Sequence, residues 1–531
     1  MSTKLIKSPL CILLMFTFIK GIVWSAVIPP FQASDEQNHF AYIQFVAENG
    51  RRSIPWSEKN ISEELALTLN LTSFSSTGTH PFYTFQKSKT TNGINEDEIN
   101  KLPFESRKNY VQQAAGSAYP PIYYLIGSFF YKSLYNHPII DRVYAVRLWS
   151  ILLGVLTVLL VFKISELFLP KSKNIPLATA AIVTLHPSFS FITSTITIDA
   201  LTIFYTTLLS YLWIMIFKDR LAWKFSLSVF LLSFLSIFVR ETLSVAPAIT
   251  LLVIVLRLKI KSYIKVSFLS GVALILYLFV RSIFFNNILS NTPLENSFRL
   301  LSNFVKQSNF LSSQIYSGEL FKNVISYLNN LIRDFNNNIF SWYWAIFGWL
   351  EVQLPFNFYR IFKLLTVISF AGIVLISLGK KKDIHIVARK DLAFIIFLIF
   401  AIAFPIFLFD FQKFVSEVGH PFGFQGRYLL PGIAVQVFLF VQGLLVWVPK
   451  KYLKQFCLSL IGLFFLIHLV SLWQIIVYFY QPASLGDVVN RIGWYKPAIY
   501  KGSYMIGWFG LYILSFVWFL YNFLFKKQTN V

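Results

Sequence analysis

Apolar runs of about 20 residues recur along this chain of 531 residues, and short polar segments separate them. A helix needs about 20 apolar residues to cross the bilayer core, so each run is a candidate membrane span. Twelve runs can be placed, at about residues 8–28, 144–168, 175–195, 200–217, 222–240, 243–257, 265–285, 358–379, 391–410, 428–447, 455–479 and 503–525. The pattern predicts an all-α polytopic membrane protein, in which residues 1–531 form a single transmembrane domain.

Two longer polar segments interrupt this pattern and are expected to be external loops. The first covers 29–143 and includes a short apolar stretch at 119–136. The second covers 286–357 and ends in an aromatic run. We expect 119–136 to form an interfacial helix on the outer leaflet rather than a thirteenth span.

Composition supports the assignment to the membrane proteins and limits the kinds of binding partner to expect. Hydrophobic residues make up 56% of the chain and charged residues only 13%, with a mean hydropathy of +0.60. A soluble domain has about a quarter charged residues. The net charge of +23 would suit nucleic acid, but the basic residues occur in short clusters between apolar runs. That placement follows the positive-inside rule, so nucleic acid is not an expected partner, whereas membrane lipids are.

The basic clusters also orient the chain. With twelve spans and both termini cytoplasmic, the inner segments contain 21 basic residues and the short outer loops contain six. A thirteenth span at 119–136 would move most inner clusters outside. Residues 8–28 could alternatively be a cleaved signal peptide, and the segment after them would still lie outside the cytoplasm. Lys20 lies inside this run, so it either snorkels or faces the bundle.

The first candidate for chemistry is the polar stretch 28–40, directly after the first span. Asp35 and Glu36 are adjacent and therefore point to different faces of a helix or strand. One could act as a base while the other binds a metal or orients a partner. The alternative is an ordinary helix start, with Ser34 as N-cap and Gln37 at the capping-box position. His39 would then share the face of Asp35.

Two further candidates lie at predicted outer span ends. Asp199 stands between two apolar runs with almost no loop, where an acid is costly unless it faces water or a partner. Arg427 opens the span after Gly426, and its guanidinium could hold a phosphate through two hydrogen bonds. The alternatives are a helix cap for Asp199 and headgroup anchoring for Arg427. No Walker loop, GxGxxG motif or zinc-type spacing is present in the sequence.

Six segments in order along the chain resemble a family of uncharacterised bacterial polytopic membrane proteins in the GT-C glycosyltransferase superfamily. That superfamily includes protein O-mannosyltransferases and lipid A aminoarabinose transferases. The similar segments are 29–40 (P-DE-x-x-H-F), 119–124 (P-P-x-Y-Y), 147–150 (R-x-x-S), 197–199, 347–351 with Pro355, and 426–431 (G-R-Y-L-L-P). The chain departs from the family pattern at two positions, where Ile198 replaces Asn and Glu351 replaces Asp.

The resemblance implies a GT-C-like bundle in the bacterial inner membrane. It implies inverting transfer of a sugar from a polyprenyl-phosphate donor to a glycan, lipid or protein acceptor on the outer face. Asp35 would be the general base, with Glu36 beside it in the catalytic site. The substrate-binding residues would be His39, Asp199, Tyr123, Tyr124, Arg427 and Tyr428. An optional Mg²⁺ or Mn²⁺ would be held by Asp35, Glu36 and Asp199.

Two alternatives remain open at this point. An envelope polysaccharide polymerase or ligase would use a lipid-linked oligosaccharide and is barely distinguishable by sequence. A lipid-linked sugar flippase or transporter would favour ionisable groups near the midplane and paired broken helices. The predicted charges lie mostly at span boundaries, which favours the transferase.

Overall fold

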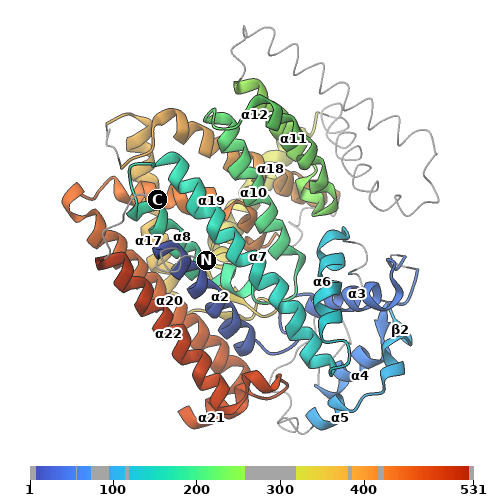
Figure 1. The fold of residues 1–531 in the computed structure, drawn as a ribbon. Helices are drawn as coiled ribbons and strands as arrows, with labels where there is room; N and C mark the ends of the chain where they lie inside the picture. The colour runs from blue at the N-terminus through green and yellow to red at the C-terminus, as the bar shows by residue number, and fades with distance from the viewer. Residues whose placement is uncertain are drawn as a thin grey trace. The chain divides into compact units, whose positions relative to one another are not determined.

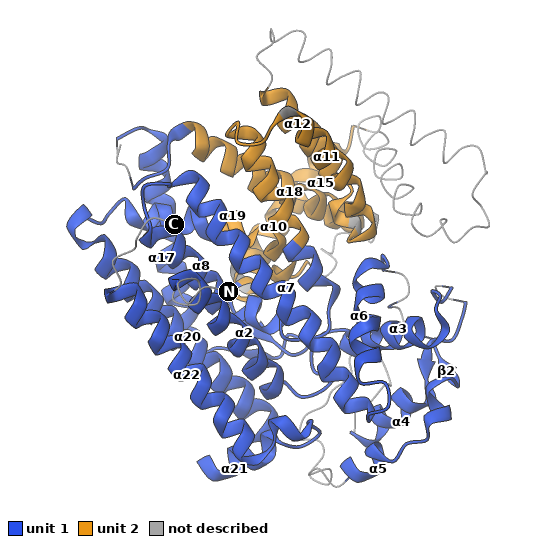
Figure 2. Cartoon of the chain, viewed as in Figure 1, with its two compact units in different colours: residues 1–204, 344–389, 437–531 blue, residues 205–343, 390–436 orange. Residues whose placement is uncertain are grey.

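Helices make up most of the chain in the computed structural model (Figure 1). The structure describes residues 8–54, 57–72, 95–113, 116, 119–257, 318–380, 385–416 and 424–525. The chain divides into two units (Figure 2), and each is considered by itself. Unit 1 comprises 1–204, 344–389 and 437–531, and unit 2 comprises 205–343 and 390–436.

Eight helical segments among the described residues are long and apolar enough to cross a membrane. They are α2 (Pro9–Val27), α7 (Ile139–Phe168), α10 (Ile198–Phe217), α17 (Phe356–Ser377), α18 (Arg389–Ser416), α19 (Ile433–Leu445) with the preceding 3-10 turn η6 (Gly426–Gly432), α20 (Leu453–Tyr480) with η7 (Lys450–Tyr452), and α22 (Gly502–Phe525). This confirms the prediction of an all-α membrane protein.

The prediction of twelve spans is met only in part. Three expected spans are shorter helices, and the expected span at 265–285 lies outside the described residues. The run 175–195 divides into α8 (Asn174–Leu185) and α9 (Pro187–Ile192). His186 between them is extended because a residue before proline is pushed out of the helical region. The next two runs form α11 (Trp223–Phe234) with η3 (Leu235–Phe238), and η4 (Glu241–Leu243) with α12 (Ala246–Arg257).

The segment between α2 and α7 folds into short elements around α3 (Glu36–Asn49) and α6 (Ile122–Ser133). The others are β1 (Ile61–Ser62), α4 (Glu63–Leu71), α5 (Glu96–Asn100), η1 (Phe104–Arg107) and β2 (Tyr110–Gln112). β1 and β2 pair antiparallel, with Ile61 opposite Gln112. α6 packs against α3 and α7 and has 12 residues, about 18 Å. It is too short to span, and its place on the outer leaflet stays a prediction.

The first apolar helix, α2, lies inside the bundle of unit 1 and packs against α22, α7 and α20. Lys20 is 1% exposed, and its ammonium donates to the Thr184 carbonyl (3.3 Å) and the Ser190 hydroxyl (3.0 Å). The lysine therefore faces the bundle, which was one of the two expected outcomes.

The rest of unit 1 includes a hairpin of β3 (Ile346–Phe347) and β4 (Val352–Gln353), followed later by α21 (Leu485–Ile492) and η8 (Ala498–Tyr500). The hairpin turn contains Gly348 and Leu350, both with positive φ. In unit 2, α15 (Leu320–Asp334) continues through the π-helical turn η5 (Phe335–Ile339) into α16 (Phe340–Trp344). Tyr327 of α15 packs against Phe411 and Phe414 of α18.

Candidate functional site

Glu36 and Arg147 form an ion pair with no exposed surface on either side chain. Glu36 is the first residue of α3, and Arg147 lies in α7. The guanidinium donates from Nε to Oε1 (2.8 Å) and from Nη2 to Oε2 (2.7 Å). Such two-point pairing fixes orientation as well as charge, and it compensates a carboxylate buried away from water. Both oxygens of Glu36 are thus engaged.

Arg147 also holds the end of the first span. Its Nη1 donates to the carbonyls of Ser25 and Ile28, and its Nη2 donates to that of Pro29, each at 2.8 Å. Carbonyls at a helix C-terminus lack partners within the helix. Lys496 adds a second donor to Ile28 (2.9 Å) and bonds the Tyr144 hydroxyl (2.5 Å). One guanidinium therefore joins α2, α3 and α7.

The segment before Asp199 is tied to the same region. The Ile196 N–H donates to Glu36 Oε1 (2.9 Å), and the Thr197 N–H donates to the Tyr123 hydroxyl (3.1 Å). That hydroxyl also pairs with Ser150 (2.8 Å), one turn after Arg147 on α7. Burial raises the pKa of Tyr123, and the charges of Glu36 and Asp199 raise it further. Asp199 therefore lies within the electrostatic reach of Tyr123, which is also within reach of Glu36.

Asp35 is the N-cap of α3 and has a left-handed backbone, with φ +63° and ψ 9°. Its side chain is partly exposed, unlike that of Glu36. A non-glycine residue in this region is uncommon, although Asp tolerates it, and the surroundings must hold it there. Phe31 in the same loop also has positive φ. The contacts that fix Glu36 and the carbonyls of 28–29 supply that constraint.

The expected N-cap at Ser34 is wrong by one residue. The Ser34 hydroxyl does not cap α3 but donates to the Gly348 carbonyl in the β3–β4 hairpin (3.2 Å). Long-range contact thus overrides the local capping pattern. This hydrogen bond also connects the loop that bears Asp35 to a segment more than 300 positions further along the chain.

His39, Tyr123 and Tyr124 are buried, with His39 3% exposed and both tyrosines without exposed surface. His39 Nδ1 pairs with the Tyr124 hydroxyl at 2.8 Å, and the Tyr124 ring lies 4.2 Å from that of Tyr42. These contacts hold α6 on α3. Their geometry suits positioning of the site better than direct contact with a substrate.

Arg427 and Tyr428 belong to unit 2, whereas the other predicted site residues belong to unit 1. Both lie in η6, where the guanidinium stands 5.5 Å from the Tyr428 ring centre. A Cβ at Gly426 would lie 2.2 Å from the Ile339 carbonyl oxygen, so this turn requires glycine. The role of Arg427 toward a phosphate stays a prediction.

No group of three His, Cys, Asp or Glu side chains suited to a metal ion occurs in the described part of the chain. The proposed ligand set of Asp35, Glu36 and Asp199 is therefore not assembled, and Glu36 already gives both oxygens to Arg147. The sequence alone does not predict the Glu36–Arg147 pair, because its members are 111 positions apart. Arg147 and Ser150 are three residues apart and therefore share one face of a helix. This spacing is the sequence signal that both side chains could reach the same site.

Eight apolar helices among the described residues, together with a buried ion pair that ties α3 to the bundle, define an all-α polytopic membrane protein. The chain belongs to the family described as predicted membrane protein (DUF2142), whose model matches residues 18–436. No curated protein matches the chain.

Proposed function

We propose that this protein is a GT-C-type glycosyltransferase of the bacterial cell membrane, with both termini cytoplasmic. It transfers a sugar from a polyprenyl-phosphate donor to a cell-envelope acceptor on the outer face. One observation carries the proposal most. The Glu36–Arg147 pair is closed, and it leaves a partly exposed carboxylate, Asp35, beside it on a constrained backbone.

In the proposed reaction, Asp35 removes the proton from an acceptor hydroxyl. The acceptor oxygen then attacks the anomeric carbon from the side opposite the lipid phosphate. The new C–O bond forms as the bond to the phosphate oxygen breaks, so the anomeric configuration inverts. Polyprenyl phosphate leaves, and Arg427 neutralises its charge. A base placed in hydrogen-bond reach of the acceptor contributes about 10²–10⁴-fold to such a step.

The neighbouring residues act as positioning residues in this proposal. Glu36 cannot accept a substrate proton without giving up Arg147, and it holds Ile196 as well. Tyr123, Ser150 and the segment 196–199 bring Asp199 toward the start of α3. Asp199, which is partly exposed, orients the acceptor.

A second function, a lipid-linked sugar flippase, is favoured by one observation. The helix break at His186 lies beside Lys20, which bonds Thr184 and Ser190 within the bundle. Transporters use such broken helices and intramembrane charges, although usually in pairs. Movement of a fluorescent polyprenyl-phosphate sugar across vesicles that contain the protein, with unchanged sugar linkage, would support this alternative over transfer.

Mass spectrometry of cell-envelope glycans, with and without the protein, tests the transferase proposal. We expect one glycan or glycosylated lipid to lose a defined sugar when the gene is deleted, and to regain it on complementation. Identical envelope glycans in both strains would contradict the proposal. A polymerase or ligase would instead change chain length or attachment and leave each repeat intact.

A further inference from the structure

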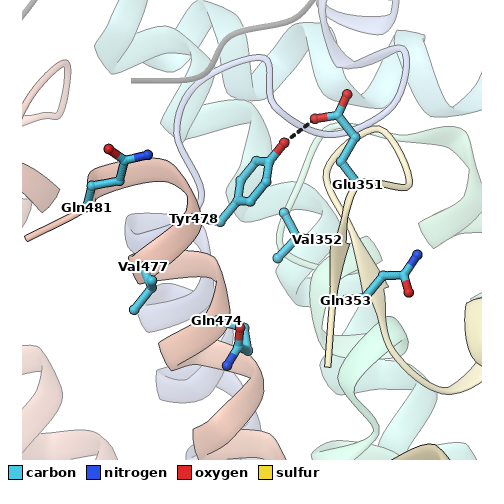
Figure 3. Close-up of a pocket in the computed structure, with 7 residues that line it drawn as sticks. All are labelled: Glu351, Val352, Gln353, Gln474, Val477, Tyr478 and Gln481. Atoms are coloured by element: carbon cyan, nitrogen blue, oxygen red, sulfur yellow. Dashed lines mark hydrogen bonds between the residues drawn. The ribbon is translucent and has the colours of Figure 1, made fainter. Parts of the chain in front are cut away.

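A pocket of about 410 Å³ lies in unit 1 between the C-terminal turns of α20 and the β3–β4 hairpin (Figure 3). Its polar lining consists of Glu351, Gln353, Gln474, Tyr478 and Gln481, and two valines lie between them. Small-molecule sites typically enclose about 300–1,000 Å³. Of its lining residues, only Glu351 lies in one of the six family-like segments, and no role follows for it from the sequence.

The helical wall of the pocket is a polar stripe on a membrane-spanning helix. Gln474 and Tyr478 are four residues apart and so share one face of α20, and Gln481 is the C-cap residue directly after this helix. Ile475 and Ile476 point elsewhere and are buried. A glutamine on an apolar span is costly in lipid and is tolerated where it faces water or a polar partner. This face of α20 is therefore built for polar contact.

The opposite wall is held in place by Glu351. Figure 3 shows Tyr478 pointing across the pocket to Glu351, and its hydroxyl donates to Oε2 of that carboxylate. The other oxygen, Oε1, accepts no hydrogen bond from any described residue. Gln353, Gln474 and Gln481 likewise keep their side-chain amides available within the described chain.

The chemistry of the lining selects a ligand class. Each carboxamide offers two N–H donors and a carbonyl acceptor, and the carboxylate and phenol add acceptors. Sugar hydroxyls donate and accept at once, so such a set matches them. The pocket lining has no Lys, Arg or His, and a phosphate there would meet the Glu351 charge without compensation. The ligand is therefore neutral and rich in hydroxyl groups.

The pocket and the loop bearing Asp35 share a structural element. Gly348, in the hairpin turn just before Glu351, accepts the hydrogen bond from Ser34. A Cβ at Gly348 would lie 3.4 Å from the Phe479 ring and 3.8 Å from the Gln32 carbonyl oxygen. The turn thus stands between the end of α20 and the loop that leads to Asp35.

We infer that this pocket is a binding subsite for a neutral glycan. Its role as the acceptor subsite rests on the proposed function, whereas the binding itself does not. Gln474 and Gln481 bind hydroxyls from the helix side, and Glu351 and Gln353 bind them from the hairpin side. A bound glycan then extends toward the loop of residues 32–35.

The test uses the full-length protein in detergent and measures equilibrium binding. The probes are neutral oligosaccharides released from the cell envelope by mild acid and labelled at the reducing end. A phosphorylated fraction of the same preparation serves as comparison. We expect the wild-type protein to retain a neutral component, and Gln474→Leu to weaken that binding at least about tenfold, a change of about 1.4 kcal/mol.

Gln455→Leu is the matched control, because Gln455 is exposed near the other end of α20. It should bind as the wild type does. Gln353→Leu gives a second test at an exposed position whose change leaves the helix bundle intact. Preference for the phosphorylated fraction, no retention of neutral glycan, or wild-type binding by both pocket variants would overturn the inference.

The Asp35→Asn variant separates the two proposals. If Asp35→Asn and the wild type both bind glycan and neither transfers sugar, the subsite stands and the transferase proposal fails. If the wild type transfers sugar but binding is unaffected by the pocket variants, the transferase stands and the subsite fails.

Discussion

Two buried carboxylates in the segment between α2 and α7 are each held by an arginine of α7, and comparing them distinguishes a structural contact from a candidate site. Glu36 pairs with Arg147, and Glu64 pairs with Arg142 and Arg107. Both clusters are almost free of solvent exposure. Around Glu64, Gln44 donates to the second carboxylate oxygen (2.8 Å) and Arg142 also bonds Tyr131. This cluster therefore holds α4 to α7.

The Glu36 cluster differs in its neighbours. It borders the left-handed, partly exposed Asp35 and, through Ile196, the segment before Asp199. Burial of an ion pair therefore does not mark a functional site by itself. A constrained and accessible carboxylate beside a closed pair is what makes the Glu36 cluster a candidate site, because the closed pair fixes the backbone that presents it.

The largest expected effect on stability is that of Arg147→Met. This change leaves Glu36 buried without its single arginine, so we expect a loss of about 3–5 kcal/mol. Arg142→Met should cost less because Glu64 keeps Arg107. Thermal unfolding in detergent measures both. An equal or larger cost for Arg142→Met would remove the distinction between the two clusters.

The double variant Glu36→Met with Arg147→Met sharpens this test. Replacing both members of a buried pair by apolar residues is often close to neutral. We therefore expect the double variant to be more stable than Arg147→Met alone. Additive losses would show that Arg147 acts mainly through the carbonyls of Ser25, Ile28 and Pro29.

Tyr123→Phe should have an intermediate effect. It removes the partner of Ser150 and leaves the Thr197 N–H unsatisfied, at a cost of about 1–3 kcal/mol. Sugar transfer should fall by more than the loss of stability alone explains. The reason is that the segment bearing Asp199 loses the hydrogen bond from the Thr197 N–H to Tyr123. Tyr135→Phe is the control, since the hydroxyl it removes donates to Glu48 rather than pairing with the 196–199 segment. Equal loss of transfer in both variants would argue against a special role for the 196–199 segment.

A smaller effect depends on pH and involves Lys496. Burial lowers the pKa of Lys496 well below its ordinary value of 10.5, and the nearby Arg147 lowers it further. Between the lowered pKa and 10.5 the unfolded chain binds more protons than the folded chain, so stability rises with pH in that window. Unfolding temperatures of wild type and Lys496→Met, compared from about pH 7 to about pH 10, should show that rise in wild type only. Parallel curves would contradict it.

The apolar pattern was sufficient to predict the membrane class and most long helices, because membrane spans require long apolar runs. The apolar pattern did not predict the helix break at His186, because the apolar run 175–195 continues through this residue. The local capping pattern predicted Ser34 as the N-cap of α3, because such a pattern takes no account of a distant partner such as Gly348. The segments 29–40, 119–124, 147–150 and 197–199, which the sequence singled out as candidates, are joined by hydrogen bonds in unit 1, and their role in a reaction stays a prediction.

What sequence could not supply was the difference between Asp35 and Glu36. Two adjacent carboxylates have the same chemistry until a partner 111 positions away closes on one of them. The pocket at Glu351 escaped notice for a similar reason, since its walls come from 351–353 and 474–481. Helical spacing marks a polar face of α20, but only the fold shows which segment lies opposite.

The central claim is that Asp35, not Glu36, is the reacting carboxylate, and the envelope product of Asp35→Asn tests it most directly. Cells carrying Asp35→Asn at wild-type protein levels are compared by mass spectrometry with cells carrying Asp97→Asn, a change at an exposed Asp in the same segment between α2 and α7. The account predicts at least about 100-fold less of the sugar-bearing product for Asp35→Asn and normal amounts for Asp97→Asn. Wild-type amounts of product from Asp35→Asn would contradict it.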